Sequence, residues 1–210
     1  MTIIASRKNR LSSRRNVVAT LLFGAAAPAM LIGCSRAAPS YDSTDITGAT
    51  FAKDFGLQDH QGKLRTMADF RGKIVVVFFG FTQCPDVCPT SMTTMAEVKR
   101  LLGDQGKLLQ VIFITVDPER DTLPLLMAYM QNFDPTFLAL RPEPDQLKAL
   151  ADEFKVYYKR VEGKTPTSYS MDHSAGKYIF DPEGRVRLFS SYGKEATVIA
   201  KDIQTLLASK

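Results

Sequence analysis

Two apolar runs dominate the pattern of hydrophobic and polar positions along this chain. Residues 74–81 and 108–116 are almost entirely branched or aromatic, which predicts two strands buried on both faces of a sheet. The residues between them predict a helix from about Pro89 to Leu102, because proline suits a first helical turn and Gly103 suits the position after a helix end. The centre of the chain is therefore expected to fold as a buried strand, a helix and a second buried strand.

Shorter segments on either side predict two hairpins and three further helices. The hairpins are expected at residues 55–65 and 178–189, each around a turn-forming sequence. The helices are expected from near Thr122, over the apolar stripe of residues 147–154, and over residues 198–207. This order predicts an α/β, thioredoxin-like fold, with a mixed central sheet flanked by helices and an extra N-terminal β-hairpin.

The N-terminal segment has the order of residues that is typical of an export signal. Residues 1–15 contain five basic and no acidic residues, and an uncharged stretch follows up to Gly33. The sequence Leu-Ile-Gly-Cys that ends at Cys34 resembles the lipobox of bacterial lipoproteins, in which the cysteine sulfur is acylated and the chain is cut just before it. We therefore expect residues 1–33 to be a cleaved lipoprotein signal, with an uncleaved membrane anchor as the alternative. The pair Arg14-Arg15 also resembles the twin-arginine export signature.

Either alternative places the folded part outside the cytoplasm. A lipoprotein would lie on the periplasmic side of a bacterial membrane, anchored through Cys34. Residues 34–50 are rich in small and polar residues and are expected to form a flexible linker, and residues 51–210 one domain. The whole chain has 27 basic and 22 acidic residues, but the signal holds five of the basic ones, so the rest is close to neutral. We therefore expect no nucleic-acid binding, and we expect a monomer.

Two cysteines follow the first buried strand. Cys84 and Cys88 stand in the sequence Cys-Pro-Asp-Val-Cys-Pro, between the carboxyl end of the strand and the start of the predicted helix. Open α/β sheets place their chemistry at such junctions, and the helix dipole there favours thiolate over thiol. Two thiolates held close together exchange disulfides or bind a soft metal. Asp86 between them is a candidate for a supporting residue.

One histidine is expected to join this pair. In a thioredoxin-like fold, the loop before the late hairpin lies against the cysteine turn, and this loop contains His173. Two thiolates and an imidazole make a set of three ligands. Soft thiolates select Cu(I) and imidazole suits both copper states, whereas zinc usually takes a fourth ligand or a catalytic water.

Other residues that resemble ligands or catalytic groups are given structural roles. Met92 and Met95 fall on the predicted helix at a spacing that indicates core packing rather than a thioether copper path. His60 lies in a predicted turn and is interpreted as solvated. In residues 117–122, the aspartate and threonine are expected to cap the following helix, and Arg120 to pair with a nearby acid.

Three motifs in this order resemble those of the Sco/SenC family of copper-binding, thioredoxin-fold proteins, which assist assembly of cytochrome c oxidase. They lie at residues 79–90, 117–122 and 169–174, and the resemblance covers about residues 51–207. It implies that Cys84, Cys88 and His173 are the ligands of copper, as Cu⁺ and Cu²⁺. It also implies a disulfide between the two cysteines in the oxidised form. The implied partner is the copper-site subunit of cytochrome c oxidase, together with other periplasmic copper carriers or thiol reductants.

Two functions of different kinds follow from the same residues. The first is a copper metallochaperone, which is not an enzyme and which passes its metal on by ligand exchange. The second is a thiol–disulfide reductase that keeps the copper-ligand cysteines of the oxidase reduced, since a thiolate is both a ligand and a nucleophile. A redox sensor is a further alternative. A peroxidase is disfavoured, because a peroxidatic cysteine needs its own activating pocket.

Overall fold

The computed structural model describes residues 39–165 and 168–209. The export signal expected at residues 1–33 and the acylated Cys34 lie outside this part of the chain. None of the helices in the described part combines the length and the apolar character needed to cross a membrane.

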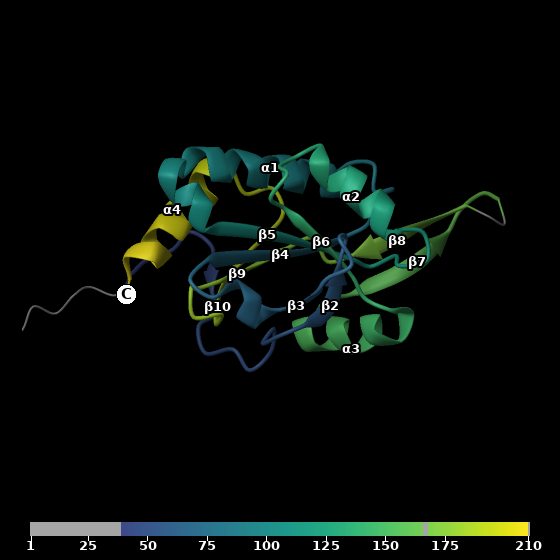
Figure 1. The fold of residues 1–210 in the computed structure, drawn as a ribbon, viewed down its shortest axis with the longest axis horizontal. Coiled ribbons are helices and arrows are strands. Elements are labelled where there is room, and N and C mark those ends of the chain that lie inside the picture. The colour runs from purple at the N-terminus through teal and green to yellow at the C-terminus, as the bar shows by residue number, and fades with distance from the viewer. Residues whose placement is uncertain (1–38, 166–167, 210) are drawn as a thin grey trace, which may run out of the picture. The chain divides into compact units, whose positions relative to one another are not determined.

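A mixed sheet of eight strands forms the centre of the described domain (Figure 1). The pairs β4–β5 and β5–β6 are parallel and the other neighbouring pairs are antiparallel. Along the sheet the strands follow in the order β1 (Thr44–Asp45), β10 (Val186–Ser190), β9 (Lys177–Phe180), β4 (Ile74–Gly80), β5 (Leu109–Thr115), β6 (Leu138–Arg141), β2 (Gly56–Asp59) and β3 (Leu64–Thr66).

Helices cover both faces of this sheet, which confirms the predicted α/β, thioredoxin-like architecture. Figure 1 shows α1 (Val87–Leu101), α2 (Leu123–Gln131) and α4 (Ala196–Ala208) on one face and α3 (Pro144–Phe154) on the other. Short 3₁₀ helices occupy Met67–Phe70 and Gly103–Leu108. A separate two-stranded sheet pairs β7 (Tyr158–Glu162) with β8 (Tyr169–His173) and projects from one end of the domain (Figure 1).

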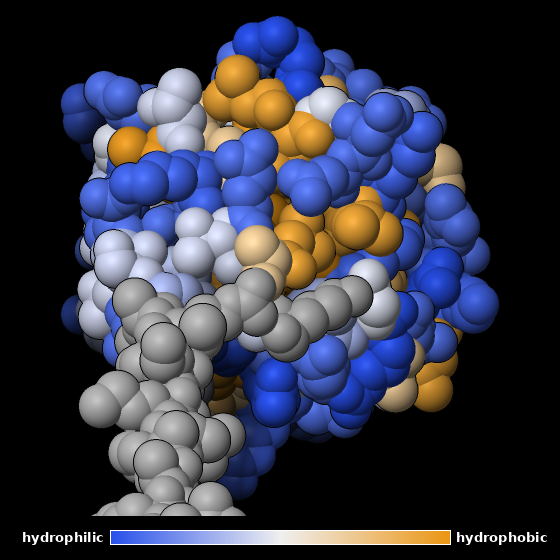
Figure 2. Space-filling view, turned by 90° about the vertical axis from the view of Figure 1, so that its left-hand side faces the viewer, coloured by the Kyte–Doolittle hydropathy of each residue, from blue (hydrophilic) through white to orange (hydrophobic). Residues whose placement is uncertain are grey.

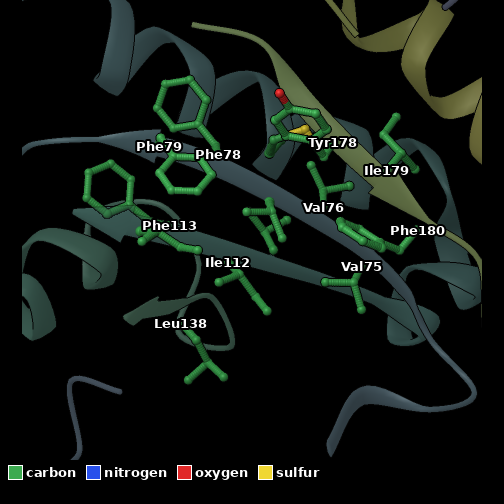
Figure 3. Packing of buried hydrophobic residues seen from close by; sticks show 14 of the residues in the cluster. Val75, Val76, Phe78, Phe79, Ile112, Phe113, Leu138, Tyr178, Ile179 and Phe180 are labelled. Carbon is green, nitrogen blue, oxygen red and sulfur yellow. The ribbon is translucent and has the colours of Figure 1, made fainter. Parts of the chain in front are cut away.

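The core is built on the two central strands. All seven residues of β4 and all seven of β5 are buried, as expected for strands covered on both faces. Phe78 and Phe113 lie next to each other from these strands, with ring centroids 6.1 Å apart (Figure 3). Phe79 packs instead on Phe154 of α3, with centroids 5.2 Å apart. The second contact holds α3 to one face of the sheet, and on the other face Phe113 packs on Tyr129 of α2, with centroids 5.6 Å apart.

Helix α1 confirms the prediction that its methionines belong to the core. Met92 and Met95 have no exposed surface. Their unbranched side chains fill the space between α1 and the sheet, a use that methionine often has in protein interiors.

The start of the domain differs from the expected linker. Strand β1 pairs with β10, and the backbone N–H groups of Asp42 and Ser43 each donate to a carboxylate oxygen of Asp202 at 2.8 Å. The N–H of Ile46 donates to the carbonyl of Arg187 at 2.8 Å. The expected boundary at residue 51 was therefore wrong, because partners more than 140 residues later in the chain order this segment.

His60 also differs from its expected solvated position. Its side chain is buried, and Nδ1 accepts a hydrogen bond from the N–H of Ala139 at 3.0 Å. The N–H of His60 in turn donates to the carbonyl of Ala139 at 2.9 Å. The turn therefore packs against β6, a four-residue strand that the sequence pattern did not reveal.

The face seen in Figure 2 carries mostly hydrophilic side chains, with hydrophobic ones gathered in a band between them. The large apolar residues with exposed surface include Leu64 on β3 and Tyr157 before β7. Exposed apolar side chains are ordinary on the surface of a folded protein.

Candidate metal centre

The structure brings together the three residues that the sequence singled out. Cys84 lies in the turn after β4, Cys88 in the first turn of α1, and His173 at the end of β8. Their ligand atoms all lie within 4.8 Å of one another, and Cys88 Sγ is 3.5 Å from His173 Nε2. One metal ion could therefore contact two sulfurs and one nitrogen at this point.

The two cysteines are free thiols that differ in burial. Cys84 is half-buried, whereas Cys88 is fully buried. The N–H of Cys88 points to Cys84 Sγ at 3.4 Å. The site thus has one sulfur accessible from solvent and one sulfur enclosed by the protein.

The enclosed sulfur lies against the backbone of β4 at Gly80. A Cβ atom at residue 80 would lie 2.9 Å from Cys88 Sγ, 2.9 Å from Phe78 and 2.7 Å from Phe113. Real Cβ atoms essentially never make contacts this short, so a side chain at residue 80 would force the sulfur or the rings to shift. The last residue of the buried strand therefore shapes the pocket of Cys88.

Burial changes the expected ionisation of Cys88. Removal from water raises the pKa of the Cys88 thiol, and negative charge at Cys84 and Asp121 acts in the same direction. In the free protein, burial therefore opposes the expected preference of the helix dipole for thiolate at this sulfur. Desolvation under aromatic rings outweighs a dipole effect worth about 0.3–1 kcal/mol.

The imidazole of His173 is oriented by a hydrogen bond on its far side. Nδ1 lies 3.0 Å from the carbonyl oxygen of Ser174, and because a carbonyl only accepts, Nδ1 carries the proton. The lone pair of Nε2 then faces Cys88. Burial lowers the pKa of His173, which keeps the ring neutral and able to ligate. The rings of Phe78 and Phe81 pack edge-on against the imidazole, with centroids 6.1 and 5.8 Å away.

His173 belongs to a strand and not to the expected loop. It pairs with Tyr158 across the β7–β8 ladder. Beyond it, the N–H of Ser174 donates to the carbonyl of Tyr157 at 2.9 Å, and the N–H of Tyr157 donates to Ser174 Oγ at 3.0 Å. The histidine is therefore held at the base of a hairpin.

Arg120 joins this hairpin to the cysteine turn. It forms an ion pair with Asp117, and its Nη1 donates to the carbonyl of Tyr169 at 2.8 Å and to Gln83 Oε1 at 3.2 Å. Its guanidinium lies 3.5 Å from the centroid of the Tyr169 ring, over which Arg160 also lies at 3.8 Å. The structure confirms the expected pairing of Arg120 with an acid, and it shows that Arg120 also spans the two ligand-bearing segments.

Asp121, in the segment expected to cap α2, has a different structural role. Its side chain has no exposed surface, and it accepts hydrogen bonds from Thr82 N at 3.1 Å, Thr82 Oγ1 at 2.6 Å and Thr115 Oγ1 at 2.5 Å. Burial raises the pKa of this carboxyl. The neighbouring Thr122 caps α2, as expected, by accepting from Leu125 N at 3.4 Å. Asp121 instead fixes the turn that leads to Cys84.

Asp86 lies at the N-cap position of α1. Its carboxylate accepts a hydrogen bond from Thr90 Oγ1 at 3.3 Å. It therefore supports the first turn of the helix that carries Cys88, and a further role beside the metal group stays a prediction.

The fold and the site together define a thioredoxin-like α/β protein that presents two thiols and one imidazole to a soft metal. A family model described as SCO1/SenC matches residues 43–208. The chain belongs to the SCO1/SenC family.

Curated relatives agree with this assignment. The mitochondrial SCO2 homolog of Bos taurus is 37% identical over 158 residues, which are 74% of this chain and 59% of the relative. An SCO2-like protein of Rickettsia felis is 38% identical over 133 residues, 63% of this chain and 65% of the relative. The chain thus spans about three fifths of the length of these relatives.

Solved structures of related proteins share the fold. Bradyrhizobium japonicum ScoI with copper bound superposes with a TM-score of 0.66 at 37% identity, covering 72% of this chain and 96% of that chain. Yeast Sco1 with copper bound gives a TM-score of 0.68 at 30% identity, covering 75% and 88%.

Proposed function

We propose that this protein binds one copper ion through Cys84, Cys88 and His173 and delivers it to the binuclear copper site of cytochrome c oxidase. The observation that carries the proposal is the convergence of three ligand atoms within 4.8 Å. Support comes from the two solved relatives with copper bound. On this proposal the protein is a metallochaperone, and copper is its cargo.

The residues present fit copper in both oxidation states. Thiolate sulfur selects Cu(I), and imidazole nitrogen binds Cu(I) and Cu(II). The neutral His173 already directs Nε2 at the site, whereas Cys88 has to lose its proton to ligate. Copper uptake should therefore release protons and tighten as the pH rises. The half-buried Cys84 gives an acceptor protein a ligand that it can displace first.

The first test is the copper content of the purified, reduced protein. We expect one copper per chain, and for Cu(II) an intense sulfur-to-copper charge-transfer band. The variant His173→Ala should lose tight copper binding, whereas His60→Asn, which changes the other histidine of the chain, should keep it. Two copper ions per chain, or a copper complex without the thiolate band, would contradict the proposal.

Oxidation gives a second test of the same ligands. A disulfide between Cys84 and Cys88 removes the two thiolates, so the oxidised protein should not bind copper and reduction should restore binding. Equal copper uptake by the oxidised and the reduced protein would show that the sulfurs are not the ligands.

A thiol–disulfide reductase is a second candidate, because both cysteines are free and the N–H of Cys88 lies 3.4 Å from Cys84 Sγ. In that reaction the two thiols lose two electrons and two protons to a partner disulfide and become a disulfide themselves. His173→Ala separates the functions, since it removes a copper ligand and leaves the thiols. Cells with this variant should lose oxidase activity as a deletion does if copper delivery is the role. They should keep it if reduction is the role, or if the protein is a redox sensor.

The place of action completes the proposal. We propose a monomer on the periplasmic side of a bacterial membrane, held there by lipid on Cys34 after removal of residues 1–33. Other periplasmic copper carriers would load it and thiol reductants would keep its cysteines reduced. The neutral charge balance of the part after the signal supports protein partners rather than nucleic acid.

A further inference from the structure

A lysine is buried at the start of β9 without a counter-charge. Lys177 is 1% exposed, and among the described residues its ammonium group has no ion pair and no hydrogen bond. Lysine is almost never fully buried unless it is paired, because taking an ammonium group out of water is costly. Burial lowers the pKa of Lys177 to about 8, so the group still carries its proton at pH 7. The domain therefore holds an uncompensated positive charge, and its presence calls for a reason.

This charge lies on the face of the sheet that α1 covers. Lys177 stands opposite Phe78 in the ladder between β9 and β4, and directly opposite residues point to the same face. The next residue, Tyr178, points to the other face, where its hydroxyl donates to the carbonyl of Phe154 on α3. Lys177 is therefore on the same side of the sheet as the helix that carries a cysteine ligand (Figure 1).

The ring of Phe78 is a neighbour of both the charge and the metal centre. Its centroid is 5.8 Å from Nζ of Lys177 and 6.1 Å from the centroid of the His173 imidazole. Phe78 also borders the buried sulfur, since a ring carbon and Cys88 Sγ both lie 2.9 Å from the position that a Cβ atom at Gly80 would take. An apolar ring screens a charge much less than water does, so the ammonium group acts on the metal centre through the protein interior.

The two oxidation states of copper would respond differently to this charge. Two thiolates and a neutral imidazole supply two negative charges in all. The complex would therefore keep one negative charge with Cu(I) and be neutral with Cu(II). A fixed positive charge nearby stabilises the first complex and leaves the second almost unaffected.

We infer that Lys177 is a specificity-determining residue of the metal centre, whose buried charge makes the site favour Cu(I) over Cu(II). This inference rests on the proposed function and adds to it the oxidation state of the cargo. One charge that acts across roughly 10 Å at an effective dielectric constant of about 20 changes a binding constant about tenfold.

The test measures the affinity of the reduced protein for Cu(I) and for Cu(II), each by competition with a chromophoric chelator. In Lys177→Met and Lys177→Gln the charge is lost, and the ratio of Cu(I) to Cu(II) affinity should fall about tenfold. This fall corresponds to a potential of the bound ion that is about 59 mV lower. Lys177→Arg keeps the charge and should keep the ratio of the wild-type protein.

Lys99→Met is the matched control. Nζ of Lys99 also lies 5.8 Å from the centroid of a phenylalanine ring, that of Phe137, but it is paired with Asp134 at 2.8 Å. Lys99 stands about three turns after Cys88 on α1, so its loss should leave the ratio unchanged. Thermal unfolding without copper checks that the variants fold, and Lys177→Met should be at least as stable as wild type because it removes a buried unpaired charge.

Each remaining outcome counts against the inference. If both neutral variants at residue 177 keep the wild-type ratio, the charge does not act on the site, and the proposed function stands. If Lys177→Arg or Lys99→Met lowers the ratio as far as Lys177→Met does, the buried charge is not the cause. If the wild-type protein binds no copper through thiolate, both the proposed function and this inference fail.

Discussion

His60 is buried and His173 is half-buried, and their rings are used in opposite ways. His60 accepts a backbone N–H through Nδ1, whereas His173 donates from Nδ1 to a backbone carbonyl. The first arrangement uses the histidine lone pair for the fold, and the second leaves the lone pair of Nε2 for the site. Sequence reasoning placed His173 correctly beside the cysteines but took His60 as solvated, because the burial of a turn depends on strands elsewhere in the chain.

His60 should make folding stability depend on pH. Burial lowers the pKa of His60 below its ordinary value near 6.5, so the unfolded chain takes up the proton first. Stability is then fully present above about pH 6.5 and falls as the pH drops below it, by at most about 1.4 kcal/mol per pH unit for one proton. Urea unfolding between pH 7.5 and 5 should show this fall.

The variant His60→Asn tests the assignment, since an amide oxygen can replace Nδ1 as the acceptor and does not titrate in this range. It should reduce the loss of stability at low pH. His173, whose pKa burial also lowers, should account for the remaining loss. An unchanged pH profile in His60→Asn would show that His60 is not the titrating group.

At the scale of elements, the long apolar and strongly periodic segments were predictable and the short ones were not. The run at residues 74–81 became β4, and the stripe at 147–154 became most of α3. Strands β1 and β6 have two and four residues, too few to show a period, and they exist because neighbouring strands offer backbone partners. The hairpin that carries His173 was hidden because its residues are exposed or half-buried, so that no apolar run marks it.

Strand β1 predicts the effect of a shorter N-terminus. A chain that starts at Phe51 lacks the two N–H groups that donate to Asp202, and it also lacks the pairing of β1 with β10. We expect the chain from Phe51 to be at least about 2 kcal/mol less stable in urea unfolding than the chain from Pro39. In the longer chain, Asp202→Asn should reproduce part of this loss. Equal stability of the two chains would mean that β1 contributes nothing to the domain.

At the scale of the whole molecule, the candidate site gathers three segments that are far apart in the sequence: the stretch with both cysteines, the turn with Arg120 and the strand with His173. The cysteine turn and α1 lie on the central sheet, whereas His173 comes from the separate hairpin and is tied back through Arg120. The motifs predicted which residues meet. They could not predict the burial of Cys88 or of Asp121, since each depends on what tertiary packing excludes from water.

The proposed lipid anchor gives a prediction for the whole protein in cells. Cys34→Ala removes the acylated residue, so the protein should leave the membrane fraction, while the folded domain should bind copper as before. Each buried methylene of a lipid chain contributes roughly 0.8 kcal/mol to membrane affinity, so loss of the chains should be decisive. Fractionation has to be combined with N-terminal sequencing, because an uncleaved signal would also retain the variant. A wild-type protein that begins at a residue other than Cys34 would contradict the lipoprotein assignment.

Gly80 has a consequence for how this chain can change over evolutionary time. Its hydrogen atoms lie where any side chain would collide with Cys88 Sγ and with two aromatic rings. A substitution at residue 80 would therefore displace the sulfur, and a bulkier residue at 88 would strike the strand. The two positions constrain each other sterically, so a lineage that no longer needed the metal would still keep both small. If a related sequence keeps both residues, the packing of the strand is enough to explain it. Their presence alone would therefore be poor evidence that the related protein still binds a metal.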